Sequence, residues 1–293
     1  MSEIVFPEGL NPKYRYTTGG DYVGKNVKIG DVGNLYKKSS NNVVDVQADT
    51  GNVTNMSYMF YDSSLYYVTL FDTSSVTDMS YMFQTCGSLI TTSQFDTSNV
   101  TTMSNMFNGC SKLTSVPLFD TSNVTTMEKM FYQCTNLRSV PLFDTSNVTN
   151  MNQMFSRTEN LITIPQFDTS NVTNMGSMFY FTKIVSIPLL DCGKISYGSN
   201  IDIVSNYSTP TLTTLGGFKD LGKVSGFSKP SSFLKSCPNL TKESVLNVLN
   251  NLYDRATAGY SVVTLPFHTN ALALLSDEEK AIATNKGWTL ATS

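Results

Sequence analysis

The sequence predicts an α/β repeat solenoid, and three observations lead to this fold class. A motif of thirteen residues recurs through the middle of the chain, and five successive copies lie 24 residues apart. Within each unit the apolar residues first recur every three or four positions and then every second position, which predicts a short helix followed by a short strand. A unit this short cannot bury its own apolar stripe, so successive units are expected to stack.

The repeats dominate the middle of the chain. Five near-identical copies of F-D-T-S-N-V-T-x-M-x-x-M-F begin at Phe71, Phe95, Phe119, Phe143 and Phe167. An earlier copy begins at Ala48 with an offset of 23 residues, and PLLDCGKI around Asp191 has the form of a degenerate seventh start. Met-x-x-Met-Phe occurs six times, and these pairs contain every methionine except Met1.

The first half of each unit predicts a short helix. In one copy the apolar stripe, with a spacing of three or four, consists of Val100, Met103, Met106, Phe107 and Cys110. The preceding Asp-Thr-Ser-Asn is a run of N-cap and turn residues, whose side chains accept hydrogen bonds from the free N–H groups of a helix start.

The second half of each unit predicts a short strand. After Leu113, the side chains of Val116 and Leu118 are expected to point inward and those of Ser115 and Pro117 outward. The proline predicts an irregular ladder rather than a continuous sheet. Strands of adjacent coils would lie roughly 4.7–4.9 Å apart, with identical residues forming ladders.

The repeated motif resembles the leucine-rich repeats of the BspA-like bacterial surface proteins, in the variant F-D-T-S-N-V-T-x-M-x-x-M-F-x-x-C-x-x-L. The resemblance covers about residues 48–195. It departs from the pattern at Thr158 and Thr182, which replace the cysteine, and between Tyr61 and Tyr67, where the spacing breaks. It implies a leucine-rich-repeat-like, right-handed coil that serves as an extracellular recognition scaffold.

Two flanking segments complete the predicted domain organisation. Residues 1–47 are rich in Gly, Tyr and Val and lack a helical period, which predicts a β-rich segment that caps the first coil or attaches the chain. Residues 196–293 are expected to form irregular last coils and an α/β C-terminal cap, because the open apolar face of the last coil has to be covered.

The C-terminal segment carries its own helix and strand signals. An amphipathic helix is predicted over residues 240–253, with Thr241 as its N-cap. A strand, SVVTLPF, follows it. A capping box formed by Ser276 and Glu279 predicts a further helix that ends at Gly287.

The composition narrows the function classes. The 293 residues carry 20 basic and 23 acidic side chains, so no basic footprint for nucleic acid or an anionic membrane surface is expected. No run of about 18 apolar residues predicts membrane insertion. The start, MSEIVFPEGLNPKYRY, lacks signal-peptide features, so export by the general secretory route is not expected. Ser, Thr, Asn and Tyr replace charge, a composition common on extracellular and virion proteins.

Two ladders of sulfur-containing residues allow a chemical and a structural interpretation. The Met-x-x-Met pairs could ligate Cu(I), but they are in phase with the apolar stripe and are expected in the core. Cys86, Cys110 and Cys134 recur at the repeat period. Disulfides between neighbours are conceivable, whereas buried free thiols are preferred because the position is apolar. No C-x-x-C pair supports a zinc site, and no metal or other cofactor is predicted.

A ladder of carboxylates recurs with the same period at Asp72, Asp96, Asp120, Asp144 and Asp168. At about 5 Å, neighbouring carboxylates would repel by ~1 kcal/mol in water and ~3 kcal/mol at an effective dielectric constant near 20. Backbone N–H donors in the turn could offset this repulsion. The alternative is a row of Ca²⁺ ions, although one Asp per coil supplies few oxygens. The turn interpretation is preferred.

No catalytic set is predicted. His268 is the chain's one histidine, and no serine or cysteine nucleophile motif lies near it. Two carboxylates suffice for a glycosidase, so a carbohydrate-active enzyme is kept as a weaker alternative. The Asn-Val-Thr triplets match glycosylation acceptors, but they coincide with the predicted helix caps.

The repeats differ where their side chains are expected to face outward, which predicts an extended binding surface. The candidate binding residues on the strand side are Tyr66, Tyr67, Thr91, Ser93, Ser115, Arg138, Ser139, Thr163 and Gln166. The alternative interpretation is neutral drift at solvent-facing positions.

The leading hypothesis is a non-enzymatic structural or recognition protein of a bacteriophage virion, associated with its tail or fibre. Residues 1–47 would contact other virion proteins, and the solenoid would bind a host surface protein or glycan. The runner-up is a bacterial cell-surface adhesin with leucine-rich repeats. Whether the protein forms a homo-oligomer is left as an open alternative. No heptad or collagen-like stretch of the sequence predicts trimerisation.

Overall fold

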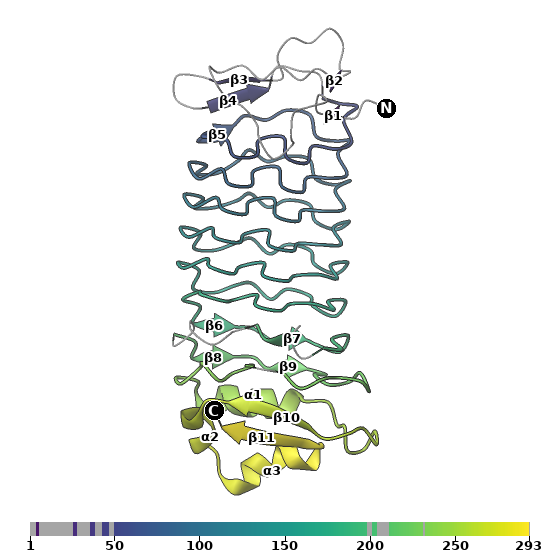
Figure 1. Ribbon diagram of the computed structural model, residues 1–293, viewed down its shortest axis with the longest axis vertical. Coiled ribbons are helices and arrows are strands. Elements are labelled where there is room, and N and C mark those ends of the chain that lie inside the picture. The colour runs from purple at the N-terminus through teal and green to yellow at the C-terminus, as the bar shows by residue number, and fades with distance from the viewer. Residues whose placement is uncertain are drawn as a thin grey trace.

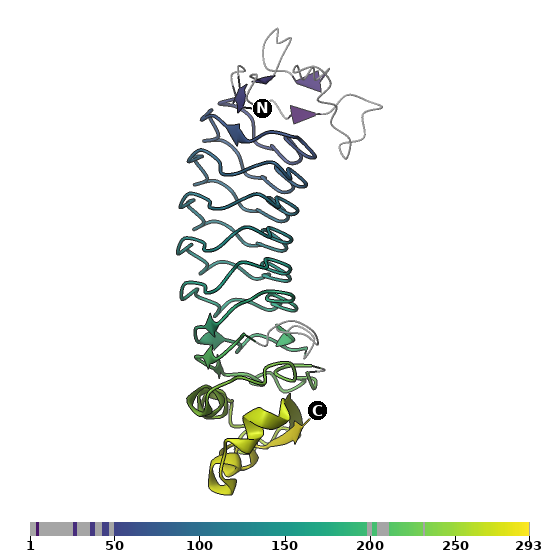
Figure 2. The same ribbon diagram turned by 90° about the vertical axis from the view of Figure 1, so that its left-hand side faces the viewer.

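The computed structural model describes residues 4–5, 26–27, 36–38, 43–46, 50–197, 201–203, 211–230 and 232–292. From residue 50 the chain runs in successive coils stacked along the long axis (Figure 1). In the view turned by 90° each coil is a flattened loop, and a compact group of helices and strands closes the C-terminal end (Figure 2).

Successive coils are in register at intervals of one repeat. Asp78 forms parallel bridges with Asn55 in the coil before it and Thr102 in the coil after it. The same position continues through Thr126, Asn150 and Asn174. Equivalent side chains of neighbouring repeats therefore lie next to one another along the stack.

The predicted short helix in each repeat is wrong: residues of the Met-x-x-Met-Phe segments form consecutive turns. Within a coil, Met106 donates its N–H to the carbonyl of Met103 at 3.1 Å, which closes one turn. Asn105 has a φ of 59°, so its backbone is left-handed and a helix cannot continue. Its N–H is donated to Glu128 in the next coil at 2.8 Å. Further turns begin at Asn105 and Phe107, so the turns overlap at intervals of two residues and bury the same stripe as a helix would.

The predicted strand is also reduced to short pieces. Coil-to-coil strands occur at β5 (Tyr67–Val68), β6 (Ser186–Ile187), β7 (Leu190–Asp191), β8 (Thr214–Leu215) and β9 (Phe218–Lys219). The pairs β6–β8 and β7–β9 are parallel. Of the two side chains expected to point inward, Val116 is buried but Leu118 is 58% exposed. The alternation is broken because Phe119, the next residue, takes the inward place.

The core of the stack consists of ladders of identical side chains. The methionines of the six Met-x-x-Met pairs are all buried. The ring of Phe107 stacks between those of Phe83 and Phe131, with centroids 5.5 and 5.7 Å away. A second column contains Phe95 and Phe119, whose rings stack at 6.5 Å. The methionines therefore belong to the core rather than to a metal site.

The cysteine ladder is buried, and all five cysteines are free thiols. Each thiol of the ladder contacts a carbonyl of the coil before it; Cys110 Sγ lies 3.0 Å from the Phe83 oxygen. Thr158 occupies the same position and donates its hydroxyl to the Phe131 carbonyl at 2.9 Å. Thr158 therefore keeps a hydrogen-bond donor at the position that cysteine occupies in the preceding repeats. Burial raises the pKa of Cys110 well above its ordinary value, so the thiol stays protonated.

Two substitutions at one cysteine test whether the thiol matters as a hydrogen-bond donor. Cys110→Thr supplies a hydroxyl donor, as Thr158 does, whereas Cys110→Val has nearly the same shape and no donor. We expect the valine variant to be less stable than the threonine variant by about 0.5–1.5 kcal/mol, because the buried Phe83 carbonyl loses one of its two donors and keeps only the N–H of Cys86, at 3.0 Å. Urea unfolding measures the difference. Equal stability of the two variants would show that the ladder is held by packing alone.

The N-terminal segment is joined to the first coil by strand pairing. The described residues here form β1 (Ile4–Val5), β2 (Asn26–Val27), β3 (Tyr36–Lys38) and β4 (Val43–Val46). Strand β4 pairs in parallel with β5, so the stack is extended by one further strand. The predicted role of residues 1–47 in attachment lies for the most part outside the described residues.

The C-terminal helix and strand signals are confirmed. Helix α1 (Lys242–Asn251) begins after Thr241, whose side chain accepts the N–H of Ser244. Strand β10 (Val263–Phe267) pairs in parallel with β11 (Trp288–Thr292). Between them lie α2 (Thr269–Ala273) and α3 (Asp277–Asn285), and α3 carries the capping box of Ser276 and Glu279.

These elements continue the stack directly. Thr241 donates its N–H to Thr213 of the last coil at 3.1 Å, and Ser244 Oγ donates to the same carbonyl at 3.0 Å. Leu221 and Leu252 form a parallel bridge. Helix α1 therefore lies where a further coil would add.

Candidate binding surface

The candidate residues lie on one side of the stack, which we call the strand face. It comprises residues 66–70, 90–94, 114–118, 138–142, 162–166 and 185–189. Six of the nine predicted residues are exposed there: Tyr66, Ser115, Arg138, Ser139, Thr163 and Gln166. Tyr67 and Thr91 are half-buried, so they present only part of their side chains.

The prediction that Ser93 faces outward is wrong, because this residue is buried. Its hydroxyl donates to the Val68 carbonyl at 2.9 Å and lies 2.7 Å from the Tyr67 hydroxyl. It replaces the proline that later repeats have at this place, and it bonds the preceding coil instead. Ser93 therefore contributes to packing and not to the surface.

Two columns on the strand face carry exposed apolar side chains, of which Tyr66 alone was among the predicted binding residues. Tyr66, Ile90 and Ile162 are exposed by 40%, 46% and 54% in one column. The other column consists of Leu70, Leu118 and Leu142, which are exposed by 66%, 58% and 61%. A signal was present: each leucine directly precedes a motif phenylalanine, and successive side chains of an extended chain point to opposite sides.

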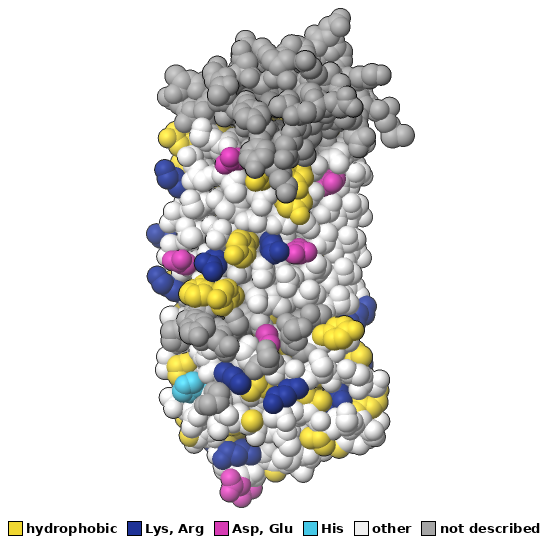
Figure 3. Space-filling model, viewed as in Figure 1, with side chains coloured by type: hydrophobic (Ala, Val, Ile, Leu, Met, Phe, Trp, Pro, Cys, Tyr) yellow, Lys and Arg dark blue, Asp and Glu magenta, His cyan; other side chains and the backbone are white. Residues whose placement is uncertain are grey.

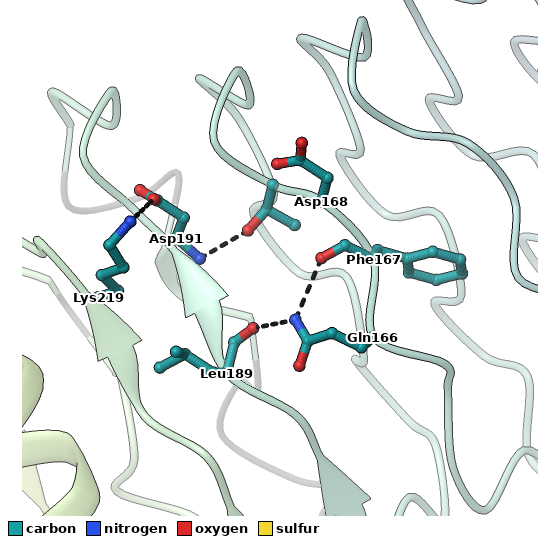
Figure 4. Close-up of a pocket in the computed structure, with 7 residues that line it drawn as sticks. Gln166, Phe167, Asp168, Leu189, Asp191 and Lys219 are labelled. Atoms are coloured by element: carbon teal, nitrogen blue, oxygen red, sulfur yellow. Dashed lines mark hydrogen bonds and ion pairs between the residues drawn. The ribbon is translucent and has the colours of Figure 1, made fainter. Parts of the chain in front are cut away.

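A pocket of about 260 Å³ lies where the strand face meets the last coils (Figure 4). It is lined by Gln166, Phe167, Asp168, Thr169, Leu189, Asp191 and Lys219. Strands β7 and β9 place Asp191 beside Lys219, because these two residues are register partners. Of the predicted residues, Gln166 alone lines this pocket.

The pocket combines fixed polar groups with apolar walls. Lys219 Nζ lies 2.7 Å from Asp191 Oδ2. Partial burial opposes ionisation of Asp191, but the bonds from Lys219 and Gly193 outweigh it and lower the pKa of this carboxyl. The amide of Gln166 donates to the Leu189 carbonyl at 2.7 Å, which ties two coils together. The arrangement suits a small polar ligand better than an apolar one.

The aspartate ladder fits the turn interpretation. The carboxylate of Asp120 accepts the N–H of Ser122 at 3.0 Å and its hydroxyl at 2.7 Å. Asp144 accepts the same two bonds from Ser146, and in both cases these bonds lower the pKa of the carboxyl. Among the described residues, no group of three or more His, Cys, Asp or Glu side chains is arranged to hold a metal ion.

The Asn-Val-Thr triplets serve the stack as well, although no helix follows them. The side-chain amide of Asn99 donates to the Ser74 carbonyl of the previous coil at 2.7 Å. Thr101 Oγ1 donates to the Thr77 carbonyl at 3.1 Å. The triplets are therefore explained by bonds between coils rather than by helix caps.

Comparison with known proteins identifies a family for this chain but no similar curated protein. A family model described as "Mycoplasma protein of unknown function, DUF285" matches residues 31–139 and 114–191, which together span more than half of the chain. No curated protein matches the chain. Among the described residues, the helices are all too short or too polar to span a bilayer.

Proposed function

We propose that this chain, which belongs to the DUF285 family, the BspA-like repeat family in general, is a non-enzymatic recognition protein. The strand face binds the surface of another protein. The stacked coils are a leucine-rich-repeat-like, right-handed solenoid of the F-D-T-S-N-V-T variant, which holds this face in one shape.

The observation that carries this proposal is the contrast between a constant frame and a variable face. The buried Val, Met and Phe ladders barely change from coil to coil, and the rings stack almost parallel. On the strand face, in contrast, equivalent places hold Tyr66, Ile90, Arg138 and Ile162. Exposed apolar side chains gathered on one face indicate an interaction site. Repeat proteins build extended binding surfaces in this way.

A double substitution on the strand face tests the proposal. Leu118→Asp with Leu142→Asp places two charges in the exposed apolar column without entering the core. We expect binding of the purified protein to intact host cells to weaken at least about tenfold, the loss of about 1.4 kcal/mol. The matched control is Val262→Asp with Leu274→Asp, because both residues are exposed apolar side chains of the C-terminal elements. Equal binding by the folded strand-face variant and the control would overturn the proposal.

We place the protein in a bacteriophage particle, bound to other virion proteins and facing the host surface. The face seen in Figure 3 supports this placement, since side chains of Lys, Arg, Asp and Glu cover only a small part of its described surface. Mass spectrometry of fractionated cultures tests the location. Recovery in DNA-containing particles after lysis is expected, whereas recovery in the envelope of unlysed cells would replace this proposal with a bacterial surface adhesin.

A further inference from the structure

A second pocket lies away from the pocket at the last coils, along the edge where the turns of the middle repeats lead into the strand face. Its volume is about 220 Å³, below the roughly 300–1,000 Å³ of pockets for drug-sized ligands. It is lined by Gly109, Ser111, Gln133, Thr135, Arg157 and Glu159. Three successive coils supply these residues, so the pocket exists only in the stacked chain.

Three long polar side chains of this pocket are exposed to solvent. The guanidinium of Arg157, the amide of Gln133 and the carboxylate of Glu159 have no hydrogen bond or ion pair within the part of the chain that the structure describes. Arg157 and Glu159 line the same pocket without pairing with each other. Ser111 and Thr135 donate their hydroxyls to carbonyls of the preceding coils and keep their acceptor lone pairs.

The guanidinium of Arg157 is held by aromatic rings. It lies 5.3 Å from the ring centroid of Phe181 and 5.9 Å from that of Tyr180. The two rings pack edge to face at 4.4 Å. Phe181 is 36% exposed, and its φ of 55° is unusual for a phenylalanine. The edge thus presents a fixed cation and an exposed apolar ring beside the pocket.

We propose that this pocket binds one uncharged hexopyranose unit of a surface polysaccharide. Sugar hydroxyls donate and accept hydrogen bonds, so they satisfy the donor Arg157, the acceptor Glu159 and the two-sided amide of Gln133. The C–H face of the sugar packs on the exposed ring of Phe181. A charged sugar would be attracted by one of Arg157 and Glu159 and repelled by the other, so its charge gains little here, whereas an uncharged unit uses both as hydrogen-bond partners. The site goes beyond the proposed protein-binding function of the strand face.

The experiment titrates the full chain with the methyl glycosides of glucose, galactose and mannose, using ligand-observed NMR. Glucuronic acid and glucosamine are the charged comparators. We expect at least one neutral glycoside to bind and Arg157→Gln and Glu159→Gln each to weaken that binding by about tenfold or more, since each replaces a charged hydrogen-bonding partner of the sugar hydroxyls by a neutral amide. Lys229→Gln and Glu243→Gln are the matched controls, because both residues are exposed and lie outside the repeats.

Three outcomes would overturn the inference: no binding of any neutral glycoside, tighter binding of a charged comparator, or binding that survives both pocket substitutions. The strand-face variant with Leu118→Asp and Leu142→Asp separates this site from the proposed function. It is expected to keep sugar binding, because both leucines lie outside the lining of the pocket. Loss of protein binding and loss of sugar binding are therefore measured independently.

Discussion

Replacing Phe107 by alanine is expected to lower the free energy of unfolding by about 3–5 kcal/mol. The side chain has no exposed surface, and its ring is stacked between two rings of the same ladder. It also packs against Phe119 of the second column, at 6.3 Å. The substitution removes an aromatic group from a site that identical residues surround on both sides, so the neighbouring coils cannot close the cavity without breaking register.

Urea unfolding of the full chain measures this loss, with Leu118→Ala as the control. Leu118 lies in the same region but is 58% exposed, so its truncation is expected to change stability by no more than about 0.5 kcal/mol. Because repeats contact only their neighbours, the phenylalanine variant is also expected to unfold in a less cooperative transition. Equal stability of the two variants would mean that the ring ladder does not hold the coils together.

The stacking of the repeats could be predicted from the sequence because a fixed spacing puts equal residues in equal places. The apolar stripe was predicted as buried, and Val100, Met103 and Phe107 are buried. The local backbone could not be predicted, because consecutive turns and a helix share the spacing of three to four residues. What decides between them is the N–H of Asn105, which is donated to the next coil and not back along its own chain.

The candidate sites could be predicted only in part. The strand face was located, yet Leu118 was assigned to the core and Ser93 to the surface. Both errors arise from assuming a regular strand where the structure has an extended chain that turns inward at each motif phenylalanine. Lys219 lies beyond the regular repeats, so no spacing predicts that this lysine pairs with Asp191 and completes a pocket with the last regular repeat. The Arg157 pocket depends on contacts among three coils.

The C-terminal elements depend on one buried arginine that has no carboxylate partner among the described residues. Arg255 has no exposed surface, and its guanidinium donates to the carbonyls of Ser261, at 3.0 Å, Val224, at 3.3 Å, and Gly222. It also lies 5.6 Å from the ring centroid of Trp288. Burial lowers the pKa of this group, but an arginine stays charged at neutral pH.

Arg255→Ala is therefore expected to destabilise these elements by about 3 kcal/mol or more, because the carbonyls of Ser261 and Gly222 lose their donor and a cavity opens beside Trp288. Hydrogen exchange should accelerate in β10 and β11 well before the repeats are affected. Strands β8 and β9, no longer covered by α1, would expose free edges that pair between molecules, so light scattering should report association. The control is Lys229→Ala, which removes an exposed cation. It should leave both the hydrogen-exchange rates and the molecular mass measured by light scattering unchanged. The prediction is contradicted if the Arg255→Ala variant stays monomeric and its β10 and β11 stay protected from exchange. Packing around Trp288 would then be sufficient to hold the C-terminal elements on the last coil.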